Sequence, residues 1–262
     1  MQRVNKKCLK KFYEEEAKHL AHQEMMYLKG NKHELWWHRK RLYYIVSFLS
    51  EIFEKNQITT FADIGCAEGF YVKYIASIHD EIFCVGADIA HKYIEKARRK
   101  GKTLNIGYIV CDVADLPFED NSIDVLLCSE VLEHVHNYGG SLAELCRVAK
   151  KYLVLSFPGH SYLYKVVSKI KSGKKLADNL VRASDVGHVS EVKVSHVKEF
   201  LKGKCKCLKT KIGGTIPLEL FEIIPSIRLV DVIDNMICKV LEHFGAVDYA
   251  TIHVMEIVVD KS

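Results

Sequence analysis

The stretch FADIGCAEGFYVKYIA, residues 61–76, decides the fold of this chain. An apolar run ends at Asp63, glycines follow at Gly65 and Gly69, and a helical pattern then begins. Small residues in such a turn let the backbone approach a ligand closely. The free N–H groups at the start of the following helix suit a carboxylate or a phosphate. The stretch therefore predicts a strand, a ligand-binding turn and a helix.

The same alternation continues beyond this stretch. Apolar runs typical of strands lie at residues 60–64, 82–87, 106–111, 123–128 and 152–157. Helical patterns lie between several of them, at residues 70–78, 91–100 and 141–149. A turn at residues 117–121 stands in place of a helix between the third and fourth strands. Apolar strands that alternate with helices indicate βαβ units and a parallel sheet covered on both faces.

The segments on either side of this core are also patterned. The first 57 residues read as helical. After Pro158, helices are predicted at 192–201 and, with a break near Pro225, at 216–244. Late strands are predicted at residues 207–212 and 250–259. Two late strands separated by a helical insertion suit an antiparallel edge on the sheet.

The composition excludes several classes of protein. The chain has 262 residues, of which 48% are apolar, enough for a sizeable core. No apolar run reaches the length of a membrane-spanning helix, and the charged N-terminus lacks a secretory signal, so we expect a cytoplasmic protein. The net charge of +5 is mild. Lysine-rich segments at 193–211 and 160–182 attract anions, although a solvated lysine face is the simpler interpretation.

The nine cysteines are scattered, and several lie inside strand-like runs. Free thiols in a reducing compartment explain this distribution better than disulfides do. Cys205 and Cys207 form a C-x-C pair without a second ligand pair, so the sequence predicts no metal site.

Acidic residues stand at the ends of the next strands. Asp88, 25 residues beyond Asp63, can bind the two hydroxyls of a ribose. Asp112 can accept a hydrogen bond from the exocyclic amine of adenine, and the N–H of Val113 can donate to a ring nitrogen. Three strand ends thus favour one nucleoside-containing ligand.

The ordered motifs DIGCAEG, GAD, CDVADLPF and FEDNSIDVLLCSEVLEHV resemble those of class I S-adenosylmethionine-dependent methyltransferases. Within that class they are most similar to the broad group of ubiquinone and menaquinone biosynthesis methyltransferases, over residues 61–157. The resemblance implies an α/β fold with a Rossmann-like, seven-stranded, mostly parallel sheet. It further implies an antiparallel C-terminal edge strand, helices on both faces, N-terminal helices and a helical lid insertion.

The resemblance also implies a cofactor, S-adenosyl-L-methionine, and a set of binding residues. Those expected around its methionine part are Asp63, Gly65, Ala67, Gly69, Ser129 and Glu130. Those expected at the ribose and adenine are Asp88, Ile89, Asp112 and Val113. Arg39 could pair with the cofactor carboxylate. Ala67 replaces the middle glycine of the family's turn, which costs little provided that its φ stays negative.

Methyl transfer from a sulfonium needs a general base only when the acceptor must lose a proton. Candidate bases follow the predicted strands or lie on the predicted lid, and they are His134, His160 and His188. The same residues serve equally as substrate contacts or as loop histidines.

We expect an N-terminal helical cap at residues 1–57 and a cofactor-binding domain at residues 58–262. Insertions at 159–190 and 214–247 would build the acceptor site. Its tyrosines and lysines suit a small-molecule or lipid-like acceptor with an apolar part and an anionic group.

The alternatives are an RNA methyltransferase that uses the lysine-rich faces, a protein methyltransferase, a catalytically silent cofactor-binding subunit and a nicotinamide dehydrogenase. An N-P-P-[FYW] run, typical of base-methylating enzymes, is missing after the fourth strand, where Ser129 to Leu132 stand. The sequence leaves the oligomeric state and the methylated atom open.

Overall fold

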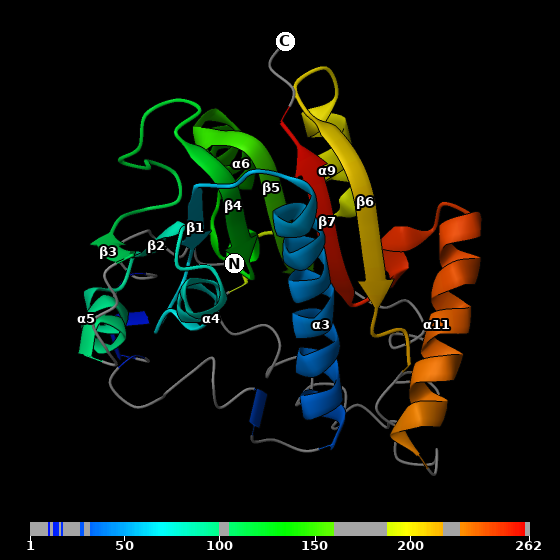
Figure 1. The fold of residues 1–262 in the computed structure, drawn as a ribbon. Helices are drawn as coiled ribbons and strands as arrows, with labels where there is room; N and C mark the ends of the chain where they lie inside the picture. Colours follow the sequence, from blue (N-terminus) through cyan, green and yellow to red (C-terminus); the bar gives the residue numbers. More distant parts are fainter. Residues whose placement is uncertain are drawn as a thin grey trace.

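In the computed structural model of this chain, the described residues are 10, 13–15, 17, 27–28, 32–99, 105–159, 188–216 and 226–259. His160 and most of the predicted lid at 159–190 lie outside them. The described strands form one seven-stranded sheet in the order β3-β2-β1-β4-β5-β7-β6 (Figure 1). Their bounds are β1 Thr60–Ile64, β2 Phe83–Asp88, β3 Ile106–Val110, β4 Ile123–Ser129, β5 Ala149–Pro158, β6 Lys206–Gly213 and β7 Ile252–Val258.

The strand order reverses at β1, which pairs in parallel with both β2 and β4. The ends of these three strands therefore lie side by side: Ile64 is in register with Ala87 on one side and with Cys128 on the other. A parallel sheet binds its ligand beyond the carboxyl ends of its strands at such a reversal. The turn that follows Ile64 occupies that position.

The C-terminal strand β7 is antiparallel to both of its neighbours, β5 and β6. The predicted seven-stranded, mostly parallel sheet with an antiparallel C-terminal strand is thus confirmed. β7 stands one place in from the edge, because β6 pairs along its outer side.

Helices cover both faces of the sheet (Figure 1). The α-helices are α3 Lys32–Lys55, α4 Phe70–Ile78, α5 His91–Arg99, α6 Tyr138–Val148, α9 Val194–Leu201 and α11 Ile227–His243, and the short 3-10 helices are η1 Leu132–His134 and η2 Val247–Tyr249. One apolar core joins α3 and α4 to the sheet, and a second joins α6 and α9 to its other face. Among the described residues, no helix has the length and apolar character needed to cross a membrane.

Helix α3 packs on the sheet through one stripe of its surface. Ile45, Phe48, Leu49 and Ile52 are almost fully buried, at the spacing of a single helical face. One turn earlier on the same stripe stands Arg41, which is also buried. The helix thereby carries a cation into the interior at the carboxyl edge of the sheet.

Where the structure describes them, the predicted strands and helices lie within a few residues of the observed ones; most of 1–31 and all of 217–225, predicted as largely helical, lie outside the described residues. The link between β3 and β4 contains no helix, as predicted. Ala149, predicted as the last residue of a helix, instead opens β5. The eight cysteines among the described residues are all free, in agreement with the prediction.

Candidate functional site

The turn after β1 is held in shape by its own backbone. The N–H groups of Gly65 and Cys66 both donate to the carbonyl oxygen of Ala87 on β2, at 2.7 and 3.0 Å. Gly65 and Gly69 have φ values of 82° and 76°, in the left-handed region that favours glycine. A Cβ on Gly65 would lie 2.2 Å from Cγ2 of Val131, just before η1. The turn and Val131, which precedes η1, can therefore lie this close only because residue 65 has no side chain.

Ala67 in the same turn also has a positive φ, of 44°. The condition that its φ stay negative is therefore not met, and its methyl group costs about 1–2 kcal/mol relative to a relaxed backbone. Its N–H explains why the turn keeps this shape: it donates to Oδ2 of Asp88 at 2.9 Å.

Asp63 is the penultimate residue of β1, and its side chain is almost fully buried. Its Oδ2 has no hydrogen-bond partner among the described residues. Burial, with a further contribution from nearby Asp88, raises the pKa of Asp63 to about 8. A buried carboxyl without a donor is costly, so this atom suits a cationic or hydroxyl-bearing ligand.

Asp88 ends β2 beside it. Its two carboxylate oxygens accept hydrogen bonds from the N–H groups of Ala67 and Ala90, at 2.9 and 2.8 Å. Burial raises the pKa of Asp88 to about 6, although these two hydrogen bonds act in the opposite direction. Each oxygen still has a free lone pair, so the carboxylate can accept two more hydrogen bonds.

The N-terminal segment reaches the same edge of the sheet, which the sequence analysis did not predict. Both oxygens of Glu14 accept hydrogen bonds from the N–H groups of His91 and Lys92, at 2.7 and 3.2 Å, and so cap helix α5. Ala17 is fully buried in a cluster with Ala67 and Ala90. Glu14 lies 77 positions before His91, so the cap leaves no local pattern in the sequence from which it could be predicted.

The predicted adenine-binding residues follow β2 and β3. Ile89 is half-buried, immediately after Asp88. Oδ1 of Asp112 accepts a hydrogen bond from the N–H of Ala114 at 2.9 Å, which shapes the turn, and Val113 is buried. These residues share the carboxyl edge with Asp63 and Asp88, because their strands are neighbours in the sheet.

Past the end of β4, a polar chain links three elements. Ser129 and Ser156 share a hydroxyl hydrogen bond of 2.8 Å, and Ser156 donates to Oε1 of Glu130 at 3.0 Å. Oε2 of Glu130 pairs with Nη1 of Arg41 at 2.9 Å. Burial by itself lowers the pKa of Arg41, but Glu130 and the nearby Tyr27 and Tyr71 outweigh it and leave the pKa raised.

The buried arginine that reaches this edge of the sheet is Arg41, whereas the sequence analysis selected Arg39 as the partner of the cofactor carboxylate. Arg39 is exposed, and its Nε donates to the carbonyl oxygen of Tyr27 at 3.1 Å. The helical stripe of Ile45 and Leu49 contained the signal: residue 41 shares that stripe and residue 39 does not.

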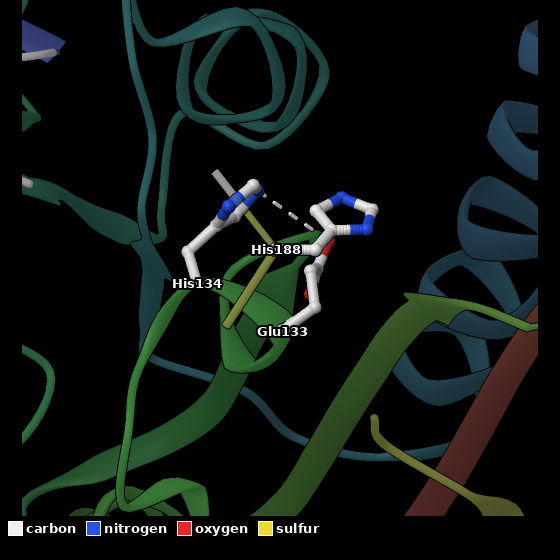
Figure 2. Close-up of side chains that lie close together, drawn as sticks. All are labelled: Glu133, His134 and His188. Carbon is white, nitrogen blue, oxygen red and sulfur yellow. Dashed lines mark ion pairs between the residues drawn. The ribbon is translucent and has the colours of Figure 1, made fainter. Parts of the chain in front are cut away.

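Two of the three candidate bases come together. His134 lies on η1, and His188 precedes α9; their ring centroids are 4.9 Å apart. The carboxyl group of Glu133, which the sequence analysis did not select, lies beside them (Figure 2). The ring of Tyr13 packs edge-on against His134, with centroids 5.5 Å apart. His160 lies outside the described residues.

The fold and this edge of the sheet point to one class of protein. Residues 62–155 match the family described as a methyltransferase domain. Together with the sheet order and the glycine turn, this match shows that the chain carries a class I S-adenosylmethionine-dependent methyltransferase domain. The predicted resemblance is confirmed, and S-adenosyl-L-methionine is the cofactor of that class.

Similar proteins of known description cover parts of the chain. An O-methyltransferase of Penicillium expansum is 26% identical over 62% of this chain and 64% of its own length. A ubiquinone/menaquinone biosynthesis C-methyltransferase of Shewanella pealeana is 34% identical over 35% of this chain and 36% of its own length. The chain thus spans less than two thirds of the length of these relatives.

A solved structure covers nearly the whole chain. The magnesium protoporphyrin IX methyltransferase of Synechocystis, with bound S-adenosylhomocysteine, covers 98% of this chain and 100% of its own, with a TM-score of 0.65 and 15% identity. At that identity the similarity shows a shared fold.

Proposed function

We propose that this protein transfers a methyl group from S-adenosylmethionine to a small-molecule or lipid-like acceptor. One observation carries the proposal: Oδ2 of Asp63 is buried at the start of the glycine turn and has no hydrogen-bond partner among the described residues. An unpaired buried carboxyl is costly unless a ligand completes it.

The residues present fit the cofactor. Asp63 would accept a hydrogen bond from its ammonium group, and the backbone at Gly65 and Gly69 would lie against its methionine part. Asp88 keeps two lone pairs for the ribose hydroxyls after accepting from Ala67 and Ala90. Ile89, Asp112 and Val113 would line the adenine.

When bound, S-adenosylmethionine supplies a methyl group on a sulfonium that is already an activated leaving group. The protein's contribution is then alignment of the acceptor and exclusion of water. Glu130, held by Arg41 and Ser156, would form one wall of the site. His134 and His188 stand where they could hold or accept a proton of the acceptor, and His160 remains a third candidate base.

The acceptor class rests on the relatives. They include an O-methyltransferase, a malonyl-[acyl-carrier protein] O-methyltransferase and a ubiquinone/menaquinone biosynthesis C-methyltransferase. We propose that the 1–57 cap and the segments 159–190 and 214–247 shape the acceptor site in the 58–262 domain, and that the acceptor has an apolar part and an anionic group.

RNA methylation is the second candidate, because a probable tRNA methyltransferase of Homo sapiens is 33% identical over 31% of this chain and 16% of its own length. The lysine-rich turn between α9 and β6 does not favour it. Lys206 is in register with Val258, which pairs with Tyr152 near the start of β5. That turn, with exposed Lys202 and Lys204, therefore lies at the amino edge of the parallel strands, opposite Asp63.

The deciding experiment is incubation of the protein with methyl-labelled S-adenosylmethionine and fractionated cell extract. Label in the small-molecule or lipid fraction supports the proposal, and label in RNA or protein would replace it with the corresponding alternative. Cofactor binding without transfer to any fraction would favour a silent binding subunit. The Asp63→Asn variant should abolish the label, whereas Asp80→Asn, an exposed carboxyl at the far end of the sheet, should leave it unchanged.

A further inference from the structure

Glu133, His134 and His188 form a compact cluster at the carboxyl edge of the sheet (Figure 2). One ligand atom from each lies within 4.8 Å of the other two. Nε2 of His134 and Oε1 of Glu133 are 3.7 Å apart. Adjacent residues of η1 supply the first two, and a segment more than fifty positions later supplies the third. This convergence is a product of the tertiary structure.

The backbone fixes His188 next to η1. The N–H groups of Val189 and Ser190 both donate to the carbonyl oxygen of Glu133, at 2.8 and 3.0 Å. The hydroxyl of Ser190 donates to the carbonyl oxygen of Val135 at 2.6 Å. Three hydrogen bonds therefore hold the backbone that follows His188 against η1, and this keeps His188 beside Glu133 and His134.

Glu133 supplies the second, independent observation. Its side chain is 2% exposed. Neither carboxylate oxygen has a hydrogen-bond partner among the described residues. A buried carboxylate without donors is strongly unfavourable, and a cation that binds it directly removes that cost. The surface pairs His79–Glu81 and His91–Glu95 have no such requirement, because each of their carboxylates is well exposed.

We propose that Glu133, His134 and His188 bind a first-row divalent metal ion such as Zn²⁺, and in this proposal the two imidazoles are metal ligands in place of general bases. Two imidazoles and a carboxylate are a donor set that such ions prefer, and three protein ligands leave coordination positions open. Metal–ligand bonds of about 2.0–2.2 Å place tetrahedral ligands about 3.4 Å apart. The His134–Glu133 separation of 3.7 Å is already close to that value, and the ligand atom of His188 lies within 4.8 Å of both.

The open positions define a class of acceptor, and this step rests on the proposed methyltransferase function. Val131, adjacent to η1, contacts the glycine turn at Gly65, so the cluster adjoins the cofactor site. The metal binds the hydroxyl oxygen of the acceptor and lowers its pKa. In the transfer, the methyl–sulfur bond breaks with its electron pair left on sulfur, a methyl–oxygen bond forms, and the hydroxyl proton leaves to solvent. The acceptor is therefore an alcohol or a phenol.

The test measures metal binding directly, on protein whose affinity tag has been removed and whose metal has been stripped by a chelator. Wild-type protein should take up about one Zn²⁺ per chain by elemental analysis, and Co²⁺ should give the visible absorption of a low-coordinate site. Glu133→Gln and His188→Ala should weaken Zn²⁺ binding about 100-fold or more, beyond the loss typical of an outer-shell change. His79→Gln, in a histidine–carboxylate pair on the surface, is the matched control and should bind like wild type.

Two results would overturn the site: no stoichiometric metal in the wild type, or equal affinity in His188→Ala. Glu133 is buried, so its variant could misfold. If thermal unfolding of Glu133→Gln is not cooperative, the test relies on His188→Ala only, because His188 is half-buried. S-adenosylmethionine binding is measured on the same samples. Loss of metal with cofactor still bound contradicts this inference only, and metal bound by a chain that binds no cofactor contradicts only the methyltransferase proposal.

Discussion

Arg41 and Glu130 form an ion pair of 2.9 Å that joins helix α3 to the residue following β4. Arg41 is 5% exposed, and Glu130 holds a positive φ of 57° within this pair. The guanidinium also lies over the ring of Trp37, 5.0 Å from its centroid. The pair is thus a structural link between the N-terminal helix and the carboxyl edge of the sheet.

Arg41→Gln should therefore be strongly destabilising. Removing one partner of a buried ion pair lowers the free energy of unfolding by about 3–5 kcal/mol. Because Glu130 is partly exposed, we expect a loss at or below the lower end of that range. A chain of this size should lose about 2–4 °C of Tm for each kcal/mol. Arg39→Gln on the exposed side of the same helix is the control, with a change within about 0.5 kcal/mol. Equal effects of the two substitutions in thermal unfolding would contradict the structural role of Arg41.

Cofactor affinity should depend on pH through Asp63. The raised pKa of about 8 means that Asp63 is mostly protonated at pH 6 and must lose a proton to accept an ammonium hydrogen bond. Affinity for S-adenosylmethionine should rise up to about tenfold per pH unit and level off above pH 8. Calorimetry between pH 6 and 9 measures this slope. Asp63→Asn should bind weakly with a flat profile in that range, and a profile identical to that of Asp80→Asn would remove Asp63 from the site.

The same carboxyl should make the unliganded protein less stable as pH rises. The folded pKa of Asp63 lies above its ordinary value of 3.8, so folding favours the protonated form. The penalty is absent below the ordinary value and grows until the pH passes about 8. Asp63→Asn should thus raise the Tm most at pH 8 and least near pH 4. A constant difference across that range would mean that Asp63 does not titrate as described.

The glycine turn offers a test with an internal control. Gly65→Ala should cost about 1–2 kcal/mol for its positive φ and about 1–3 kcal/mol for the clash with Val131. Gly203→Ala has a φ of 77° but nothing within 4 Å of the new methyl, so it isolates the backbone cost. Adding Val131→Ala should recover the clash component only. Urea unfolding of these variants measures each component, and no recovery in the double variant would show that the clash is relieved elsewhere.

Asp234 on α11 should be essential for the stability of the C-terminal half of the chain. It is fully buried, pairs with Nζ of Lys40 at 2.8 Å and accepts hydrogen bonds from Gly214 and Thr215. Asp234→Ala should lower the free energy of unfolding by about 3–5 kcal/mol. Asp231→Ala is the comparison, because its 44% exposed side chain pairs with the same lysine and should cost about 1 kcal/mol or less. Similar losses in denaturant unfolding would argue against a special role for the buried carboxylate.

Local patterns in the sequence were sufficient for the core of the fold. Strand β1 and helix α4 have the predicted bounds, because an apolar run, two glycines and a helical repeat lie within a short stretch. The acidic residues at the ends of β1, β2 and β3 could also be expected at one edge, since parallel strands place their carboxyl ends together. The positive φ of Ala67 could not, because it depends on the hydrogen bond to Asp88 of the next strand.

The sequence by itself determined which strands exist, their parallel arrangement and the edge where the glycine turn lies, because each of these follows from periodicity and turn chemistry over a few residues. Only the tertiary structure decided which charged and imidazole groups meet there. Arg41 reaches Glu130, Glu14 caps α5, and His188 joins Glu133 and His134 across long separations in the chain. The packing of helices on the sheet sets these contacts, and no short stretch of sequence contains it.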